Sequence, residues 1–356
     1  MLDVANLPIE PEQINPINPN QIYPSQTLNQ TPSQRDYSQF FRHIVGQSQA
    51  VNLLTAAMTK SRIAPAYLFA GASGVGRALT ALAFAQCLLG DRKSGHRISD
   101  GNHPDILWVE PTYLDKGKML TVKEAEAAGL KRKTLPQIRL EQIREIAEFV
   151  SRPPLESERS LVVIDEAQTM TEAPANALLK TLEEPRHATI ILIAPDGASV
   201  LPTLVSRCQK IPFVRLNQAQ MEQILTDLGY ENLPAEILAL GQGSVGNAIT
   251  AYEQFQAIPA GMLQAVRQIP ATPRQALTLA RDITQSLEVE TQLWLLDYLQ
   301  VYFWQQFTNQ TDDAQSNGMQ IQTVLEILEN AHRLIGRYVQ PKLVWEVSLL
   351  RLGGWG

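Results

Sequence analysis

One segment of the chain has the residue types and spacing needed to bind a phosphate group. In "YLFAGASGVGRALTALAFAQ", residues 67–86, an apolar run is followed by a glycine-cornered loop and then by residues typical of a helix. Glycines let a backbone turn so that its N–H groups face phosphate oxygens, and a following helix adds its positive end. Such spacing also closes ordinary strand-to-helix turns, so the flanking strand and helix are what favour a phosphate-binding loop. The loop residues expected to bind are Gly71, Gly74, Val75 and Gly76.

Two residues after the last glycine differ from those of a nucleotide-hydrolysing loop. A lysine and then a serine or threonine are usual there, whereas this chain has Arg77 and Ala78. Arginine is larger and forked, and alanine offers no hydroxyl group to Mg²⁺. We therefore expect severely reduced hydrolysis and no required cofactor. The surviving glycine backbone still allows weak binding of ATP or ADP, with Arg77 and Ala78 beside the phosphates.

A second acidic segment could complete such a site. "LVVIDEAQ", residues 161–168, is an apolar strand that ends in Asp165 and Glu166. In hydrolysing enzymes, one such carboxylate approaches the metal ion and the next activates water. Taken alone, the segment is better explained by a core strand that leaves the sheet through an acidic turn. Together with the glycine loop upstream, it favours the phosphate-site interpretation.

A third segment offers a charged side chain just before a short strand. In "LPTLVSRCQKIPF", Arg207 follows a serine and precedes a cysteine. It is either an ordinary surface arginine or an arginine finger, a planar cation presented to a phosphate in a neighbouring subunit.

The elements that must position these residues alternate along the chain. Strands at "AYLFA", "ILWV", "RSLVVI" and "ATIILIA" are separated by helical runs, which predicts a mostly parallel sheet covered on both faces. After Phe213 only helical patterns follow. The sequence thus predicts an α/β P-loop domain, a small helical lid and an all-α collar. The expected boundaries are a leader at 1–36, the P-loop domain at 37–214, the lid at 215–256 and the collar at 257–356.

Composition excludes several classes of protein. The 356 residues carry a net charge of −6, which argues against a protein that coats nucleic acid by itself. The two cysteines are far apart and form no C-x-x-C pair, so neither a disulfide framework nor a cysteine zinc site is expected. No run of about 20 apolar residues suggests a membrane span. We expect a cytoplasmic protein with no membrane partner.

Taken in order, these segments resemble the AAA+ clamp-loader family of bacterial DNA polymerase III. The similar runs include "FRHIVGQSQAVNLLTAAM", "AYLFAGASGVGR", "NHPDILWVEP", "LVVIDEAQTMTEAPANALLKTLEEP", "LPTLVSRCQKIPF" and "VQPKLVWEVSLLRL". The resemblance covers roughly residues 37–352, and the "NALLKTLEEP" and "SRC" runs are its most specific parts. It implies that Val45, Gly46 and Gln47 lie near an adenine, and that Arg207 completes the ATP site of the next subunit.

The family also implies partners and a task. Its members form a ring of five subunits, which opens the sliding clamp and places it on primer-template DNA. The partners implied for this chain in the ring are an ATPase subunit and a delta subunit. The departures in this chain agree with one another. Besides Arg77 and Ala78, the polar residue expected after "TIILI" is replaced by Ala194 and Pro195, and Gly246 stands where the lid arginine is expected. The family's zinc-binding cysteines are reduced to Cys87, so no metal is expected.

Three hypotheses remain open on sequence grounds. The chain is a stator subunit that uses Arg207 on a neighbour and hydrolyses little or no ATP. In the second hypothesis the chain is a self-sufficient ATPase in which Arg77 replaces lysine and the acidic pair stays catalytic. In the third hypothesis it is an AAA-like adaptor outside replication.

In the helical half, the aromatic run from Trp294 to Trp304 favours core packing over contact with a neighbouring subunit.

Overall fold

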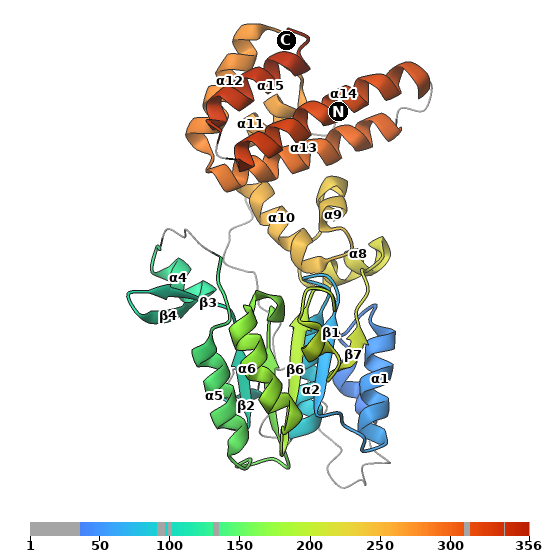
Figure 1. Cartoon of the computed structure of the whole chain (residues 1–356). Helices are drawn as coiled ribbons and strands as arrows, with labels where there is room; N and C mark the ends of the chain where they lie inside the picture. Colours follow the sequence, from blue (N-terminus) through green and yellow to red (C-terminus); the bar gives the residue numbers. More distant parts are fainter. Residues whose placement is uncertain are drawn as a thin grey trace. The chain divides into compact units, whose positions relative to one another are not determined.

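The computed structural model describes residues 36–90, 97–98, 102–130, 135–309, 314–337 and 339–355. The predicted leader, residues 1–36, lies outside this description except for Asp36. The chain divides into two compact units, Met1–Gly229 and Tyr230–Gly356, which are described separately (Figure 1).

The first unit is built on a parallel sheet of five strands in the order β2-β5-β6-β1-β7. Strand β1, which leads into the glycine loop, lies between β6 and β7. This topology confirms the predicted α/β class with a mostly parallel sheet. The strands are β1 (Ala66–Ala70), β2 (Ile106–Val109), β5 (Ser160–Ile164), β6 (Ala188–Ala194) and β7 (Gln209–Pro212).

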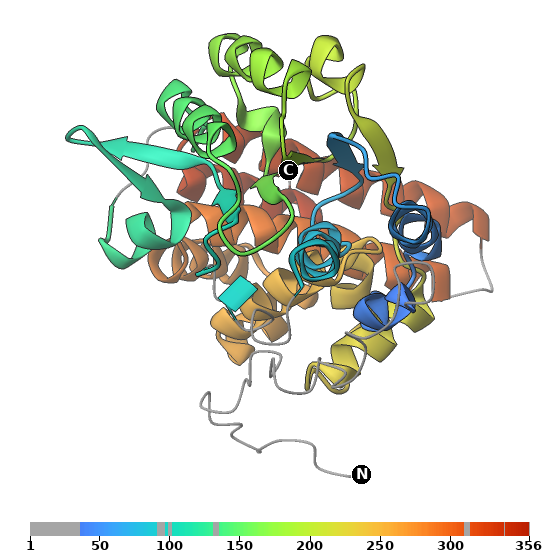
Figure 2. The ribbon, with the colours of Figure 1, turned by 90° about the horizontal axis from the view of Figure 1, so that it is seen from below.

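Helices cover both faces of this sheet, which is why β1, β5 and β6 are buried along their whole length. Side chains that alternate along β1 enter two separate cores. Tyr67 and Phe69 pack with α1 (Ser48–Thr59), α2 (Arg77–Leu89) and the short helix η4 (Tyr37–Phe41). Leu68 packs with α5 (Leu140–Ser151), α6 (Glu172–Glu183) and α7 (Pro202–Val205). Figure 2 shows the two helical layers on opposite sides of the strands.

The charged stretch between β2 and α5 folds as a small antiparallel hairpin with a helix. It contains β3 (Thr112–Asp115), β4 (Lys118–Thr121) and α4 (Val122–Ala127), and Figure 1 shows these elements extending from the side of the sheet. These strands were not among those predicted, because the short alternating runs of this stretch are too polar to indicate strands. The first unit closes with α8 (Gln218–Asp227).

The second unit is helical throughout its described residues. Its core includes Tyr298 and Trp345, both fully buried, and Leu328. The predicted lid therefore contributes α8 to the first unit and its later helices to the second. Among the described residues, no helix is both long and apolar enough to cross a bilayer. The helices are α9 (Ala235–Gly241), α10 (Val245–Ala257), α11 (Ala260–Arg267), α12 (Pro273–Ser286), α13 (Val289–Asn309), α14 (Ala314–Gly336) and α15 (Pro341–Leu352).

Candidate functional site

The glycine loop joins the carboxyl end of β1 to the first turn of α2, as the sequence predicted. Gly74 and Gly76 have φ values of 71° and 99°, a left-handed conformation that glycine adopts without strain. Gly71 is required for a different reason. A Cβ atom at this position would lie 2.5 Å from the Cβ of Phe213, so only glycine lets the loop pass this neighbour. The loop thus has the backbone shape that can turn N–H groups toward an anion.

Gln47 fastens the glycine loop to the segment that follows β7. Its side-chain N–H group donates to the backbone carbonyls of Val75, at 3.2 Å, and Val214, at 2.8 Å. Its side-chain oxygen accepts the N–H of Val214 at 3.0 Å, and the residue is only 2% exposed. Gly46 has a φ of 76° and lies against Leu216. The Val45–Gln47 segment therefore lies at the glycine loop, but the Gln47 amide bonds within the chain.

Arg77 is directed into the protein, where it meets the predicted acidic pair. It is 4% exposed, and its Nη2 atom lies 3.6 Å from Oε1 of Glu166. Its Nη1 atom is buried without a hydrogen-bond partner among the described residues. Burial lowers the pKa of the guanidinium, while the negative charges of Glu166 and Asp165 act in the opposite direction. The residue at the position expected for lysine is thus held beside the acidic pair.

The two carboxylates follow β5 at the carboxyl edge of the sheet. Burial is the main cause that raises the pKa of Asp165, and the Glu166 N–H, which donates to its Oδ1 atom at 2.9 Å, partly opposes it. Glu166 has a φ of 50°, and its carboxylate accepts a hydrogen bond from the Gln168 side chain as well as contacting Arg77. The structure therefore brings three predicted site residues together, with their charges largely directed at one another.

The donor set at this edge does not fit a magnesium ion. Ala78, in the first turn of α2, packs against the apolar core and its side chain offers no oxygen. The nearby hydroxyl of Thr80 donates to the backbone carbonyl of Gly76 at 2.8 Å within the helix. The Arg77 guanidinium also places a positive charge beside Asp165 and Glu166, where a divalent cation would be repelled. In the described part of the chain, no cluster of three or more histidine, cysteine or carboxylate side chains is arranged to hold a metal ion.

Arg207 lies at the opposite edge of the sheet from this acidic pair. It follows α7 and precedes β7, whereas Asp165 and Glu166 follow β5. Its side chain is 39% exposed. Nη2 lies 2.8 Å from Oε1 of Glu183, the last residue of α6, and Nη1 donates to the carbonyl of Thr203 at 3.1 Å. The fold therefore does not bring Arg207 to the phosphate loop of its own chain.

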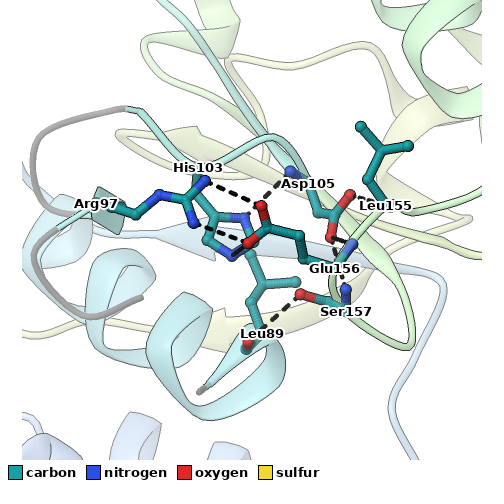
Figure 3. A network of polar contacts seen from close by, with 7 residues as sticks. All are labelled: Leu89, Arg97, His103, Asp105, Leu155, Glu156 and Ser157. Atoms are coloured by element: carbon teal, nitrogen blue, oxygen red, sulfur yellow. Dashed lines mark hydrogen bonds and ion pairs between the residues drawn. The ribbon is translucent and has the colours of Figure 1, made fainter. Parts of the chain in front are cut away.

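A buried polar network at the amino edge of the sheet was not predicted from the sequence. Asp105, 1% exposed, accepts the backbone N–H groups of Leu155, Glu156 and Ser157 at 2.6, 2.9 and 2.7 Å (Figure 3). The Nδ1 atom of His103 in turn accepts the Asp105 N–H at 3.1 Å. The signal in the sequence was an aspartate in "HPD" directly before a buried strand.

The same network ties three elements together. Arg97 and Glu156 form a two-point ion pair at 2.8 and 3.2 Å, and the Ser157 hydroxyl donates to the Leu89 carbonyl at the end of α2 (Figure 3). This polar network lies beside the loop that corresponds to the zinc module of the clamp-loader family. Most of that loop, 91–96 and 99–101, falls outside the described residues.

The aromatic run of the second unit mainly forms core. Tyr298 is fully buried, its hydroxyl accepts hydrogen bonds from the Arg267 guanidinium, and its ring stacks between Trp294 and Tyr302. Trp304 is 53% exposed and is the exception in this run. Core packing was the favoured interpretation of this run, and the contacts of Tyr298 agree with it.

Sequence comparison matches the chain to two family descriptions in succession. Residues 46–217 match "DNA polymerase III, delta subunit", and residues 219–352 match "Cyanobacterial DNA polymerase III delta prime, C-terminal domain". The delta' subunit of DNA polymerase III from Bacillus subtilis is 33% identical over 213 residues, covering 57% of this chain and 58% of that protein. The delta' subunit from Pseudomonas aeruginosa is 31% identical over 200 residues, covering 52% and 55%. The match thus spans less than two thirds of either relative.

More distant similarity extends to other proteins of this kind. The tau subunit of DNA polymerase III from Escherichia coli is 27% identical over 263 residues, covering 70% of this chain and 38% of that protein. Among solved structures, a gamma-subunit-related protein from Thermotoga maritima gives a TM-score of 0.46 at 16% identity, covering 86% of this chain and 99% of the other. The two family matches together span residues 46–352, one with a delta description and one with a delta-prime description, and with the two delta' relatives they show a chain similar to DNA polymerase III subunits of the delta-prime kind.

Proposed function

We propose that this chain is the stator subunit of a DNA polymerase III clamp loader. In this role it helps the complex to place the sliding clamp on primed DNA and hydrolyses little or no ATP itself. Its Arg207 acts as an arginine finger on the ATP site of a neighbouring subunit. The observation that carries the proposal is the position of Arg207, half-exposed at the edge of the sheet away from its own phosphate loop.

Several contacts support weak or absent hydrolysis at the chain's own loop. Water activation needs a carboxylate that is free to accept a proton, yet Glu166 is held by Arg77 and by Gln168. Ala78 supplies no hydroxyl for a metal ion. Since phosphoryl transfer depends on positioning and charge stabilisation, both features disfavour turnover. Weak binding of ATP or ADP to the glycine loop stays part of the proposal.

The position of Arg207 supports action on another molecule. An arginine finger stabilises the charge that develops on the transferred phosphoryl group, so its guanidinium must reach that phosphate. Arg207 and the phosphate loop lie at opposite edges of one parallel sheet. A phosphate that meets Arg207 therefore comes from a neighbouring subunit, which we propose to be the ATPase of the tau or gamma kind. The remaining partners are a delta subunit, the sliding clamp and primer-template DNA, in a five-subunit ring.

The experiment compares ATP hydrolysis and clamp loading by a reconstituted complex that contains wild-type chain or Arg207→Ala. We expect the variant to fold and assemble normally but to lower both rates by tenfold or more, since arginine fingers contribute about 10³–10⁵ in kcat. Arg152→Ala is the matched control, because Arg152 is also exposed and ion-paired on the same unit. An Arg207→Ala complex with wild-type rates would refute the proposal.

A self-sufficient ATPase is the second candidate, and one observation favours it. Arg77 stands at the position expected for lysine, contacts Glu166 and lies near Asp165, so the loop cation and the acidic pair are present at one site. In that case the isolated chain would hydrolyse ATP, and Glu166→Gln would abolish the activity. Turnover by the isolated chain at the level of a buffer blank rejects this candidate. Co-purification with subunits of the tau or gamma kind distinguishes the stator subunit from an adaptor outside replication.

A further inference from the structure

The guanidinium of Arg207 is held at two points by its own chain. Nη2 pairs with Oε1 of Glu183 at 2.8 Å, and Nη1 donates to the backbone carbonyl of Thr203 at 3.1 Å. The Arg207 N–H bonds to the Leu204 carbonyl at 3.1 Å, so its backbone follows the end of the four-residue helix α7. Of the two partners of the guanidinium, Thr203 acts through its backbone carbonyl and Glu183 acts through its side chain.

Glu183 is attached to a more rigid element than Arg207. It is the last residue of α6, a helix of 12 residues whose Leu178 and Leu182 are buried in the core beside the sheet. Arg207 lies in the turn between the short helix α7 and β7. An arginine side chain has many rotamers, and a contact with a fixed helix end restricts them. Glu183 therefore adds a second fixed point to a side chain that α7 holds only through the Thr203 carbonyl.

The contact leaves most of the guanidinium available. Arginine has five N–H groups in a planar fork, and the bonds formed by the described residues use two of them. The side chains of Arg207 and Glu183 are 39% and 53% exposed, so solvent reaches this ion pair. A phosphate can bind the remaining N–H groups while the contact with Glu183 is kept.

We propose that Glu183 is a positioning residue, which holds the Arg207 guanidinium in the orientation that meets the phosphate of a neighbouring subunit. This inference rests on the proposed function of Arg207. Glu183, in the run "KTLEEP", would thus contribute to the ATP site of the next chain through Arg207. Preorganisation matters at such a site because a misplacement of about 1 Å costs up to about a hundredfold in rate.

A charge series at position 183 tests the proposal in the reconstituted complex. Glu183→Gln keeps an oxygen that accepts from Nη2 and should retain most of the turnover. Glu183→Ala removes the contact and should lower kcat on the order of tenfold with little change in KM for ATP. Glu183→Lys repels the guanidinium and should approach the loss caused by Arg207→Ala. Glu184→Ala is the matched control, since it removes the same charge from the adjacent exposed position and should leave kcat unchanged.

The double variant decides whether Glu183 acts through Arg207. If it does, Glu183→Ala combined with Arg207→Ala has the rate of Arg207→Ala alone, and all variants share the wild-type melting temperature within about a degree or two. Independent, multiplicative losses would overturn the inference. Wild-type or faster turnover by Glu183→Ala would also overturn it, the latter because Glu183 would then sequester the arginine. If Arg207→Ala itself has no effect, the proposed function fails instead.

Discussion

Replacement of Asp105 by asparagine tests how the amino edge of the sheet is held together. The Oδ1 atom of Asp105 accepts the Leu155 N–H, and Oδ2 accepts those of Glu156 and Ser157. Asparagine offers one carbonyl oxygen and one NH₂ group, so at least one buried N–H loses its acceptor and faces another donor. The remaining bonds lose the assistance of a full charge. We expect the free energy of unfolding to fall by about 2–4 kcal/mol.

The pH dependence of this loss provides a second readout. Burial raises the pKa of Asp105, but the three backbone N–H groups and the Ser157 side chain outweigh it and bring the pKa below the ordinary value. Because the folded pKa is the lower one, the carboxylate stabilises the fold fully above its unfolded pKa of about 4. This contribution is lost as pH falls through the folded pKa. The difference between wild type and Asp105→Asn should be constant from about pH 7 to 5 and shrink below about pH 4.

Urea unfolding followed by circular dichroism measures both quantities. Asp227→Asn is the control, since Asp227 is exposed at the end of α8 and its replacement should change the free energy of unfolding by no more than about 0.5 kcal/mol. Equal stability of Asp105→Asn and wild type at pH 7, or a difference that grows toward acid pH, would refute the reasoning.

Three further predictions follow from the first unit. Gly71→Ala should lower the unfolding free energy by about 1–3 kcal/mol, because the new Cβ would lie 2.5 Å from that of Phe213; chemical denaturation measures this. Cys208 should react slowly with a thiol reagent at pH 8, since burial raises its pKa to about 12, and the rate should rise on unfolding. Arg77→Lys alone should leave ATP turnover by the isolated chain at background, because Ala78 still lacks a metal-binding hydroxyl; a phosphate-release assay checks this.

Each of these has a matched comparison. Gly261→Ala lies in α11 with open space around its Cβ, so it should be neutral or stabilising by up to about 1 kcal/mol; a loss equal to that of Gly71→Ala would contradict the steric argument. Rapid reaction of the Cys208 thiol in the folded chain would contradict the raised pKa of this partly buried residue. Turnover restored by Arg77→Lys would show that the alanine is not limiting.

The P-loop architecture could be predicted because its signals are local. Buried strands such as "LVVI" and "TIILI" are apolar along their whole length, and Gly90 ends α2 where the helical pattern stops. The meeting of Arg77 with Asp165 and Glu166 followed from topology, because the loop after β1 and the turn after β5 share one edge of a parallel sheet.

Other features depend on contacts between distant residues and carry no local pattern. The bond of Gln47 to Val214 joins positions 167 residues apart. The three acceptor bonds of Asp105 reach a loop about 50 residues away. Similarly, "SRC" identifies Arg207 as a candidate, but only the fold brings it to Glu183 at the end of α6. The hairpin formed by β3 and β4 was missed because strands of four residues with Lys116 and Gly117 at the turn give too weak an alternation.

We propose that Arg207 serves an ATP site in another chain, so its removal should change the activity of that chain. The most direct measurement is ATP turnover by the tau- or gamma-type subunit and delta, titrated with wild-type chain or with Arg207→Ala, each chain also being assayed alone. We expect no turnover by the wild-type chain or the variant alone, stimulation by the wild type, and a rate lower by tenfold or more with the variant at equal assembly. Equal stimulation by both chains, or turnover by the isolated wild-type chain, would contradict it.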